Sequence, residues 1–301
     1  MKVARERIGL MFTRPRVTLS MLPVLLLGAG PAASIDRTLA ERSAATQPCP
    51  TRDVRVDGKS LHFIVCDGRR QAPVIILEAG ATLDSTEWTG VIAQLAGRTD
   101  ATIIAYDRAG MGKSQALDTP YDIVQEVDRL HAALRKLKRA RPLLLVGHSY
   151  GGYLIQLYAH RHRRDVAGLV YVDANTITGI GGVEGAKALI DPVIEADRKG
   201  QGRFNDMRLA RGYVAATETM VRIPPPAGIP VTVITQGAID LPMTDPGLKR
   251  WRDGHLALAK ASGGRMIYAD GAGHLIPTEK PKIVADAILA TLNAARGSPA
   301  N

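Results

Sequence analysis

A serine between two glycines offers the clearest chemistry in the sequence, in Gly147-His148-Ser149-Tyr150-Gly151. This pentapeptide directly follows the apolar run 143–146 and precedes a stretch with helical character, 150–160. A strand, a sharp turn and a helix in this order form a nucleophile elbow, in which small neighbours leave room for a strained serine. The N-terminus of the helix favours negative charge that develops at the exposed hydroxyl. We therefore predict that Ser149 is a nucleophile; the alternative is a polar turn without catalysis.

A serine hydroxyl is a poor nucleophile without a neighbouring base. After a nucleophile elbow, the acid and then the histidine follow the serine along the chain. His274 fits this order, because it follows the expected strand 265–269 in a loop with two glycines. We expect the side chain of His148 to point away from the serine hydroxyl. The remaining histidines are expected to be structural or exposed to solvent: His62, His131, His160, His162 and His255.

Two aspartates could orient the imidazole and stabilise its cation. Asp173 ends the apolar run 169–172, and Asp240 follows the run 231–234. Both would lie at the carboxyl edge of a parallel sheet, where the sites of such sheets are found. Because either could instead cap a turn, the residues alone leave both open.

Two backbone N–H groups are needed to bind the negatively charged oxygen of a tetrahedral intermediate. One is expected from Tyr150, and the other from the loop after the run 74–77. We assign the second to Ala81, in Glu78-Ala79-Gly80-Ala81. No metal or cofactor is expected, because no cysteine–histidine group has ligand spacing and no strand precedes Gly-x-Gly-x-x-Gly.

Strands and helices must alternate to position these residues. Helical spacing of apolar residues in 121–138 and 281–294 predicts amphipathic helices. Short runs that are apolar throughout predict strands buried on both faces of a parallel sheet. The alternation indicates an α/β fold with helices on both faces of the sheet. The predicted strands are 74–77, 102–106, 143–146, 169–172, 231–234 and 266–268.

The N-terminus has the order of a secretory signal peptide, residues 1–33, with basic residues, an apolar run and small residues. The apolar run is short for a membrane span, so an uncleaved anchor is the alternative and the only expected membrane contact. Residues 34–50 are interpreted as a linker. We expect an exported protein, periplasmic or secreted, after cleavage.

Cys49 and Cys66 flank a predicted hairpin with Asp57-Gly58 as its two-residue turn. In this register Cys49 faces Cys66, in a non-hydrogen-bonded pair that brings side chains close together. A disulfide is therefore predicted for an oxidising compartment, with two unrelated free cysteines as the alternative.

Several segments together resemble successive blocks of the α/β-hydrolase superfamily, across about residues 52–296. The resemblance implies an eight-stranded, mostly parallel sheet with a small helical cap after strand six. The chain is most similar to a subgroup with Glu-Ala-Gly at the oxyanion loop, in which an aspartate after strand six recurs. This favours Asp173, whereas the wider superfamily, with its acid after strand seven, keeps Asp240 as the alternative. The blocks are Leu77-Glu78-Ala79-Gly80, Tyr106-Asp107-Arg108-Ala109-Gly110-Met111-Gly112-Lys113-Ser114, Gly147-His148-Ser149-Tyr150-Gly151-Gly152, Tyr171-Val172-Asp173-Ala174 and Gly273-His274-Leu275-Ile276.

The domain organisation follows from a break in the strand–helix rhythm. Residues 51–175 and 229–298 form the expected hydrolase core, and 176–228 are longer than a normal connection. We interpret 176–228 as a cap; an ordinary helical excursion without a gating role is the alternative.

These features predict an exported serine hydrolase that cleaves a carboxylic ester of a small molecule through an acyl-enzyme. The alternatives are an amide or C–C bond hydrolase on the same triad, and a non-catalytic binding protein with this fold. The serine argues against haloalkane dehalogenase and epoxide hydrolase chemistry, for which this superfamily uses an aspartate nucleophile. The net charge of +10 could suggest nucleic acid. With only 4% aromatic residues to stack on bases, no nucleic-acid partner is expected.

Overall fold

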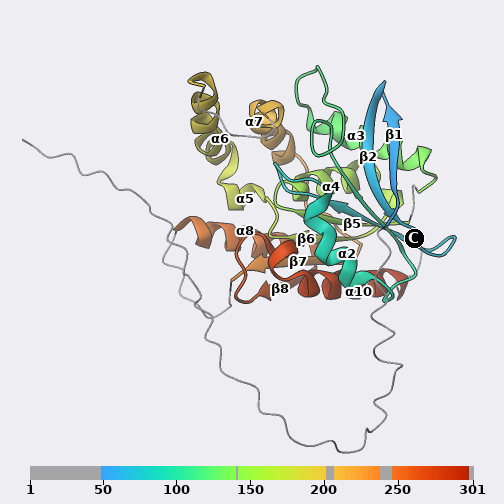
Figure 1. Ribbon diagram of the computed structural model, residues 1–301. Helices are drawn as coiled ribbons and strands as arrows, with labels where there is room; N and C mark the ends of the chain where they lie inside the picture. Colours follow the sequence, from blue (N-terminus) through green and yellow to red (C-terminus); the bar gives the residue numbers. More distant parts are fainter. Residues whose placement is uncertain (1–48, 140–141, 201–206, 238–245, 298–301) are drawn as a thin grey trace, which may run out of the picture. The chain divides into compact units, whose positions relative to one another are not determined.

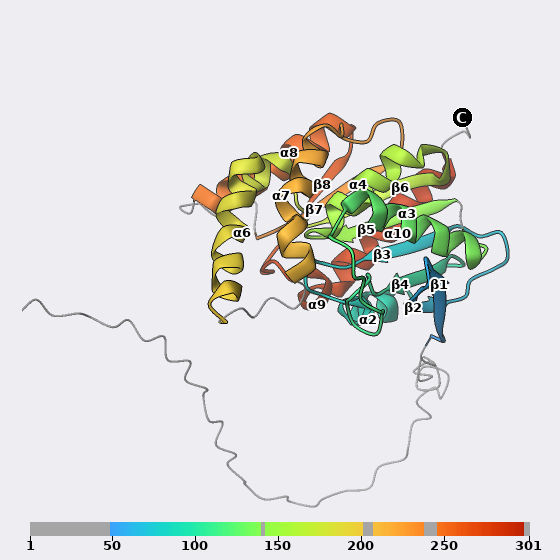
Figure 2. The same cartoon turned by 90° about the horizontal axis from the view of Figure 1, so that it is seen from above.

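One eight-stranded sheet forms the centre of the computed structural model, which describes residues 49–139, 142–200, 207–237 and 246–297 (Figures 1 and 2). The strand order is β1-β2-β4-β3-β5-β6-β7-β8. Strand β2 runs antiparallel to both of its neighbours, and all other neighbouring pairs are parallel. The strands are β1 (Thr51–Val56), β2 (Lys59–Cys66), β3 (Val74–Glu78), β4 (Thr102–Tyr106), β5 (Leu143–His148), β6 (Val166–Val172), β7 (Val231–Gln236) and β8 (Arg265–Ala269).

Helices cover both faces of this sheet, as predicted. One layer is made by α3 (Ile123–Lys136), α4 (Gly151–Arg161) and α8 (Pro246–Ser262). The opposite layer contains α2 (Thr89–Leu95), α9 (Ile276–Glu279) and α10 (Pro281–Gly297), and Figure 1 shows α10 running along the sheet. Two 3-10 turns, η1 (Ser85–Trp88) and η2 (Arg163–Asp165), complete the connections.

The two layers enclose separate apolar cores, because successive side chains of a strand point to opposite faces. On β3, Val74 and Ile76 belong to the core with α3 and α4, whereas Ile75 and Leu77 belong to the core with α10. Burial on both faces explains why these strands are apolar throughout rather than alternating.

In the described part of the connection between β6 and β7, at the position expected for a cap, there are three helices. They are α5 (Ile177–Ile180), α6 (Gly182–Arg198) and α7 (Met207–Val221). Helices α6 and α7 pack side by side in both views (Figures 1 and 2). The side-chain amide of Asn175, just after β6, donates to the hydroxyl of Tyr213 on α7 at 2.6 Å. This hydrogen bond joins α7 to the edge of the sheet.

The N-terminal hairpin has the predicted register and the predicted disulfide. Asp57 and Gly58 both have left-handed φ angles, +50° and +77°, which a type I′ turn requires. The N–H of Val65 donates to the carbonyl of Pro50 at 2.9 Å. The next pair outward is therefore non-hydrogen-bonded, and its members Cys49 and Cys66 are bonded with 4.8 Å between their Cα atoms.

The predicted fold class is confirmed, and each predicted strand coincides with an observed one. The sequence did not predict α2, α5 and α9, because helices of two turns or fewer show too little periodicity. The predicted signal peptide and most of the linker lie outside the described residues. Among the helices that the structure describes, none has the length and apolar character needed to cross a bilayer.

Candidate active site

Ser149 lies in the sharp turn between β5 and α4, with a left-handed φ of +50°. This conformation is costly for a residue other than glycine, by about 1 kcal/mol or more. Backbone hydrogen bonds hold it in place. The N–H of Ser149 donates to the carbonyl of Val172 at 3.1 Å, and its carbonyl accepts from Asn175 at 2.8 Å. The end of β6 therefore fixes the turn that carries the serine.

Glycines are required around this turn because the chain segments approach each other closely. A Cβ atom on Gly147 would lie 2.6 Å from the carbonyl oxygen of Gly151. A Cβ atom on Gly151 would lie 2.5 Å from the carbonyl oxygen of Glu78. These are sterically forbidden separations, so the glycines of the pentapeptide serve the elbow geometry that the sequence predicted.

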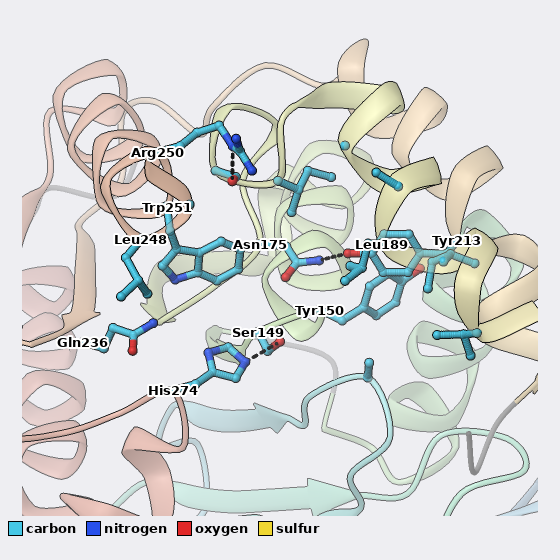
Figure 3. Close-up of a pocket in the computed structure, with 18 residues that line it drawn as sticks. Ser149, Tyr150, Asn175, Leu189, Tyr213, Gln236, Leu248, Arg250, Trp251 and His274 are labelled. Atoms are coloured by element: carbon cyan, nitrogen blue, oxygen red, sulfur yellow. Dashed lines mark hydrogen bonds between the residues drawn. The ribbon is translucent and has the colours of Figure 1, made fainter. Parts of the chain in front are cut away.

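The structure brings Ser149, His274 and Asp173 into one hydrogen-bonded chain. Figure 3 shows the part of it that joins His274 to Ser149. The Nε2 atom of His274 lies 3.0 Å from Oγ of Ser149. The Nδ1 atom of His274 lies 2.6 Å from Oδ2 of Asp173. The three residues follow β5, β8 and β6, and the carboxyl ends of parallel strands lie at the same edge of the sheet.

Asp173 is fully buried, and both of its carboxylate oxygens accept hydrogen bonds. The backbone N–H of Gln236 donates to Oδ1 and its side-chain amide donates to Oδ2, each at 3.0 Å. Burial alone would raise the pKa of Asp173, but the hydrogen bonds from His274 and Gln236 outweigh it and hold that pKa below the ordinary value. The carboxylate therefore stays ionised and can orient an imidazole or stabilise an imidazolium.

The two aspartates that the sequence left open have different outcomes. Asp173 contacts His274, whereas Asp240 lies outside the described residues. Helix α8 places His255 close to Asp173 as well, with 3.9 Å between Nδ1 and Oδ1. Burial lowers the pKa of His255, so the ring is neutral and donates from Nε2 to the carbonyl of Ala174 at 2.8 Å. Its place is structural, as predicted, although it lies directly behind the candidate acid.

The two residues expected to supply oxyanion donors, Ala81 and Tyr150, line the cavity that contains Ser149. Within the described part of the chain, the backbone N–H groups of Ala81 and Tyr150 donate to no protein acceptor. Tyr150 precedes the first residue of α4, so its N–H also lies at the positive end of the helix dipole. The two groups are free to bind a negatively charged oxygen.

Buried Arg108 holds the loop that carries Ala81. Its guanidinium donates to the carbonyl oxygens of Ala79 at 2.7 Å, of Ala81 at 2.9 Å and of Gly80. In a trans peptide the carbonyl and the following N–H point in opposite directions. Because the carbonyl of Gly80 faces Arg108, the N–H of Ala81 faces the other way. Glu78 accepts from Arg108 at 2.7 Å and balances its charge in the interior.

A cavity of about 620 Å³ opens beside Ser149 and His274 (Figure 3). Residues of α5, α6, α7 and α8 line it, and the ring of Trp251 stands edge-on to His274, with 5.8 Å between ring centres. Most lining side chains are apolar, which suits the apolar part of a small ligand. The lining includes Ile180, Ala188, Leu189, Ile190, Val193, Tyr213, Leu248, Arg250 and Trp251.

The structure also brings together His131, His162 and Asp165, with candidate ligand atoms within 4.8 Å of one another. The two imidazole rings stack in parallel, with 3.9 Å between centres and 1° between planes. A metal ion binds in the plane of an imidazole, and no point lies in two parallel planes. This arrangement therefore does not hold an ion between both rings.

The sequence analysis did not identify three side chains that shape the site: Gln236, Arg108 and Glu87. Gln236 lies two residues beyond the predicted strand 231–234 and ends the observed β7, whereas Arg108 belongs to one of the superfamily blocks, so both had a weak signal. Glu87 had none, because it lies in a short turn between two predicted strands. In the described part of the chain, His148 makes no hydrogen bond to Oγ of Ser149, and its Nε2 lies 2.8 Å from the carbonyl oxygen of His274.

Comparisons with known proteins give a family match over most of the chain. Residues 74–287 match the Alpha/beta hydrolase family. The chain is 33% identical over 118 residues to "Uncharacterized protein YqjL" of Bacillus subtilis, which covers 39% of this chain and 46% of that protein. It is 32% identical over 126 residues to a haloalkane dehalogenase of Sphingobium indicum, which covers 38% of this chain and 42% of the relative. The chain thus matches less than half the length of these curated relatives.

A solved structure supports the fold over a larger part of the chain. A hydrolase from Pseudomonas aeruginosa PA01 has a TM-score of 0.62 at 21% identity, and the match covers 83% of this chain and 100% of that one. At this identity the likeness concerns the fold alone.

Proposed function

Because the chain belongs to the α/β hydrolase family, we propose that it is a serine hydrolase that cleaves carboxylic esters through an acyl-enzyme. Ser149 is the nucleophile, His274 the general base and acid, and Asp173 the orienting carboxylate. The observation that carries this proposal is the continuous chain of hydrogen bonds from Oδ2 of Asp173 through His274 to Oγ of Ser149.

The reaction proceeds in two acyl transfers. In the first, Oγ of Ser149 attacks the ester carbonyl while Nε2 of His274 takes its proton, and Asp173 stabilises the imidazolium. The N–H groups of Ala81 and Tyr150 bind the oxyanion. His274 then protonates the departing alkoxide, and the alcohol leaves an acyl group on Ser149. In the second transfer, His274 activates a water that releases the acid.

The serine also favours this chemistry over that of the dehalogenase relative. Attack of a serine oxygen on a carbon–halogen bond would leave an ether on the protein, which water does not cleave under mild conditions. An acyl ester on the same oxygen hydrolyses readily with the same histidine as base. Turnover therefore requires an acyl substrate. Among ester, amide and C–C bonds, the ester has the leaving group that departs most easily, so it needs the least help from a general acid.

We further propose that residues 176–228 act as a cap that selects the acyl group. Ile180, Leu189 and Tyr213 of this segment line the cavity with largely apolar surface. The favoured substrate is a small molecule with an apolar acyl chain. The preferred length of the acyl chain is tested with a series of p-nitrophenyl esters whose acyl groups have two to twelve carbons. Ala188→Leu narrows the cavity, so it should shift the acyl length with the highest kcat/KM toward shorter chains. An unchanged optimum would argue against a selective role of the cap.

Export is proposed from the N-terminal pattern of residues 1–33 and from the disulfide between Cys49 and Cys66. Disulfides persist in oxidising compartments such as the periplasm. N-terminal sequencing of the mature protein tests this proposal. A chain that retains residue 1 would be an anchored or unprocessed protein instead.

The central experiment is labelling of the purified protein with a fluorophosphonate probe, which reacts with activated serines. We expect labelling and ester hydrolysis by the wild type and neither by Ser149→Ala. Ser262→Ala is the matched control, because this serine on α8 does not line the cavity. A folded wild type that neither labels nor hydrolyses any ester would leave only the binding-protein alternative.

A further inference from the structure

Three separate loops carry the candidate nucleophile, base and oxyanion donor, and one buried side-chain pair contacts all three. The pair is Glu87 in η1 and His148, the last residue of β5. Their side chains are 2% and 1% exposed. Neither residue belongs to the proposed triad.

The contacts form one continuous path through the interior. Oε2 of Glu87 accepts from the backbone N–H of Gly80, next to Ala81, at 3.0 Å. Oε1 of Glu87 lies 2.5 Å from Nδ1 of His148. Nε2 of His148 lies 2.8 Å from the carbonyl oxygen of His274, and the two rings approach to 4.8 Å between centres. His148 is itself bonded to Ser149 along the chain, so the path links all three loops.

The chemistry of the acceptor fixes one proton of His148. A carbonyl oxygen only accepts, so Nε2 of His148 carries a hydrogen and donates it to His274. Nδ1 of His148 and Oε1 of Glu87 lie 2.5 Å apart, and in the described part of the chain neither atom has a hydrogen-bond partner. Because both side chains are buried, each of these two polar atoms depends on the other in place of water.

We infer that Glu87 and His148 are positioning residues, which set the place of the His274 imidazole relative to Ser149 and the oxyanion loop. This inference rests on the proposed function. His274 needs such an anchor because its side chain is 42% exposed and it follows a glycine. A base misplaced by about 1 Å can slow an enzyme by about 100-fold.

The test compares removal of the path with its chemical repair. In Glu87→Gln, the amide oxygen can accept from Gly80 and the amide N–H can donate to Nδ1 of His148, so each contact keeps a suitable polar atom. Glu87→Ala and His148→Ala break the path. His160→Ala, on the exposed end of α4, is the histidine control.

We expect His148→Ala and Glu87→Ala to lower kcat by about 10- to 100-fold with KM within about threefold, because the acyl pocket is untouched. Glu87→Gln should recover most of the activity that Glu87→Ala loses. Thermal unfolding of each variant identifies those that are folded at the assay temperature. If an alanine variant is unfolded, the test rests on Glu87→Gln, which keeps the contacts. A folded Glu87→Gln protein whose kcat is about 10- to 100-fold below that of the wild type would overturn the inference.

Two further results would also overturn it. One is wild-type kcat in folded His148→Ala, and the other is a rise in KM with kcat unchanged. Failure of the proposed function is a different outcome, because then the wild type itself would not react with the fluorophosphonate.

Discussion

At the scale of single residues, Asp173 combines a buried negative charge with an unfavourable backbone conformation. It is buried with a left-handed φ of +40°, and it accepts hydrogen bonds from both His274 and Gln236. An ionised carboxylate is stable in such a place only because donors replace the lost water. Its charge and its hydrogen-bonding pattern can therefore be tested separately from its size.

Replacing Asp173 by asparagine keeps the size and removes the charge. The amide presents an N–H to an imidazole that must itself donate from Nδ1, so the ring adopts the wrong tautomer for proton transfer from Ser149. We expect kcat for ester hydrolysis to fall by about 10,000-fold while the protein stays folded. Steady-state kinetics with a p-nitrophenyl ester measures the loss. Near-normal activity in Asp173→Asn would transfer the role of the acid to another residue, with Asp240 the first to examine.

The same carboxylate should make stability depend on pH. Burial raises the pKa of Asp173, but its hydrogen bonds lower it further, so the folded value lies below the ordinary 3.8. Such a group stabilises the fold above its unfolded pKa, and this contribution is lost as pH falls through the folded pKa. We expect the free energy of unfolding to fall below pH 3.8 more steeply for wild type than for Asp173→Asn. Urea unfolding at about pH 7, 4 and 3 measures this free energy for both proteins. The same pH dependence in the wild type and in Asp173→Asn would contradict this assignment.

At the scale of elements, the connection between β5 and α4 depends on how closely α4 approaches β6. A Cβ atom on Gly152, in the first turn of α4, would lie 2.5 Å from Cβ of Ala174, just after β6. The position of a Cβ atom is fixed by its backbone, so the contact cannot be relieved by a change of rotamer. The approach of the helix to the strand therefore positions the turn that holds Ser149.

Gly152→Ala should consequently destabilise the protein, although alanine is the better helix former. The overpacking cost of about 1–3 kcal/mol exceeds the gain in helix propensity of about 1 kcal/mol. We expect a lower free energy of unfolding together with a lower kcat, because α4 must shift beside Ser149. Gly297→Ala at the end of α10 is the control, because a Cβ there meets nothing within 4 Å. Equal stabilities of the two variants in urea would show that α4 has room to move.

At the scale of the whole molecule, the disulfide and the candidate site lie at different parts of the sheet. Cys66 ends β2, which is separated from β5 by β4 and β3 in the strand order. The bond closes a loop between residues 17 positions apart and so restricts the unfolded chain more than the folded one. Its effect should appear in stability and not in catalysis.

The double variant Cys49→Ser/Cys66→Ser should lose about 2–4 kcal/mol in free energy of unfolding, as is usual for a loop of this length. Its kcat and KM at a temperature where it is folded should match the wild type. Reduction of the wild type with dithiothreitol should have the same effect on stability. A large change in KM would mean that the hairpin influences the cavity in a way that its place in the sheet does not suggest.

The sequence by itself determined the features that depend on near neighbours. Apolar runs located the strands, because burial on both faces excludes polar side chains. Asp57-Gly58 fixed the hairpin register and with it the pairing of Cys49 with Cys66, because a two-residue turn leaves no freedom of alignment. Gly147 and Gly151 around Ser149 indicated the elbow, because the crowding they relieve is local.

Only the tertiary structure decided which distant side chains meet. The hydrogen bond between Asp173 and His274 joins residues 101 positions apart, and that between His148 and His274 spans 126 positions. The contacts of Gln236 with Asp173 and of Glu87 with Gly80 likewise join residues whose meeting the sequence did not predict. Such contacts depend on which strand ends become neighbours at the sheet edge and how far each loop reaches over it. Periodicity and spacing in the sequence report burial and local geometry. They carry no information about the order of the strands in the sheet or about the reach of the loops.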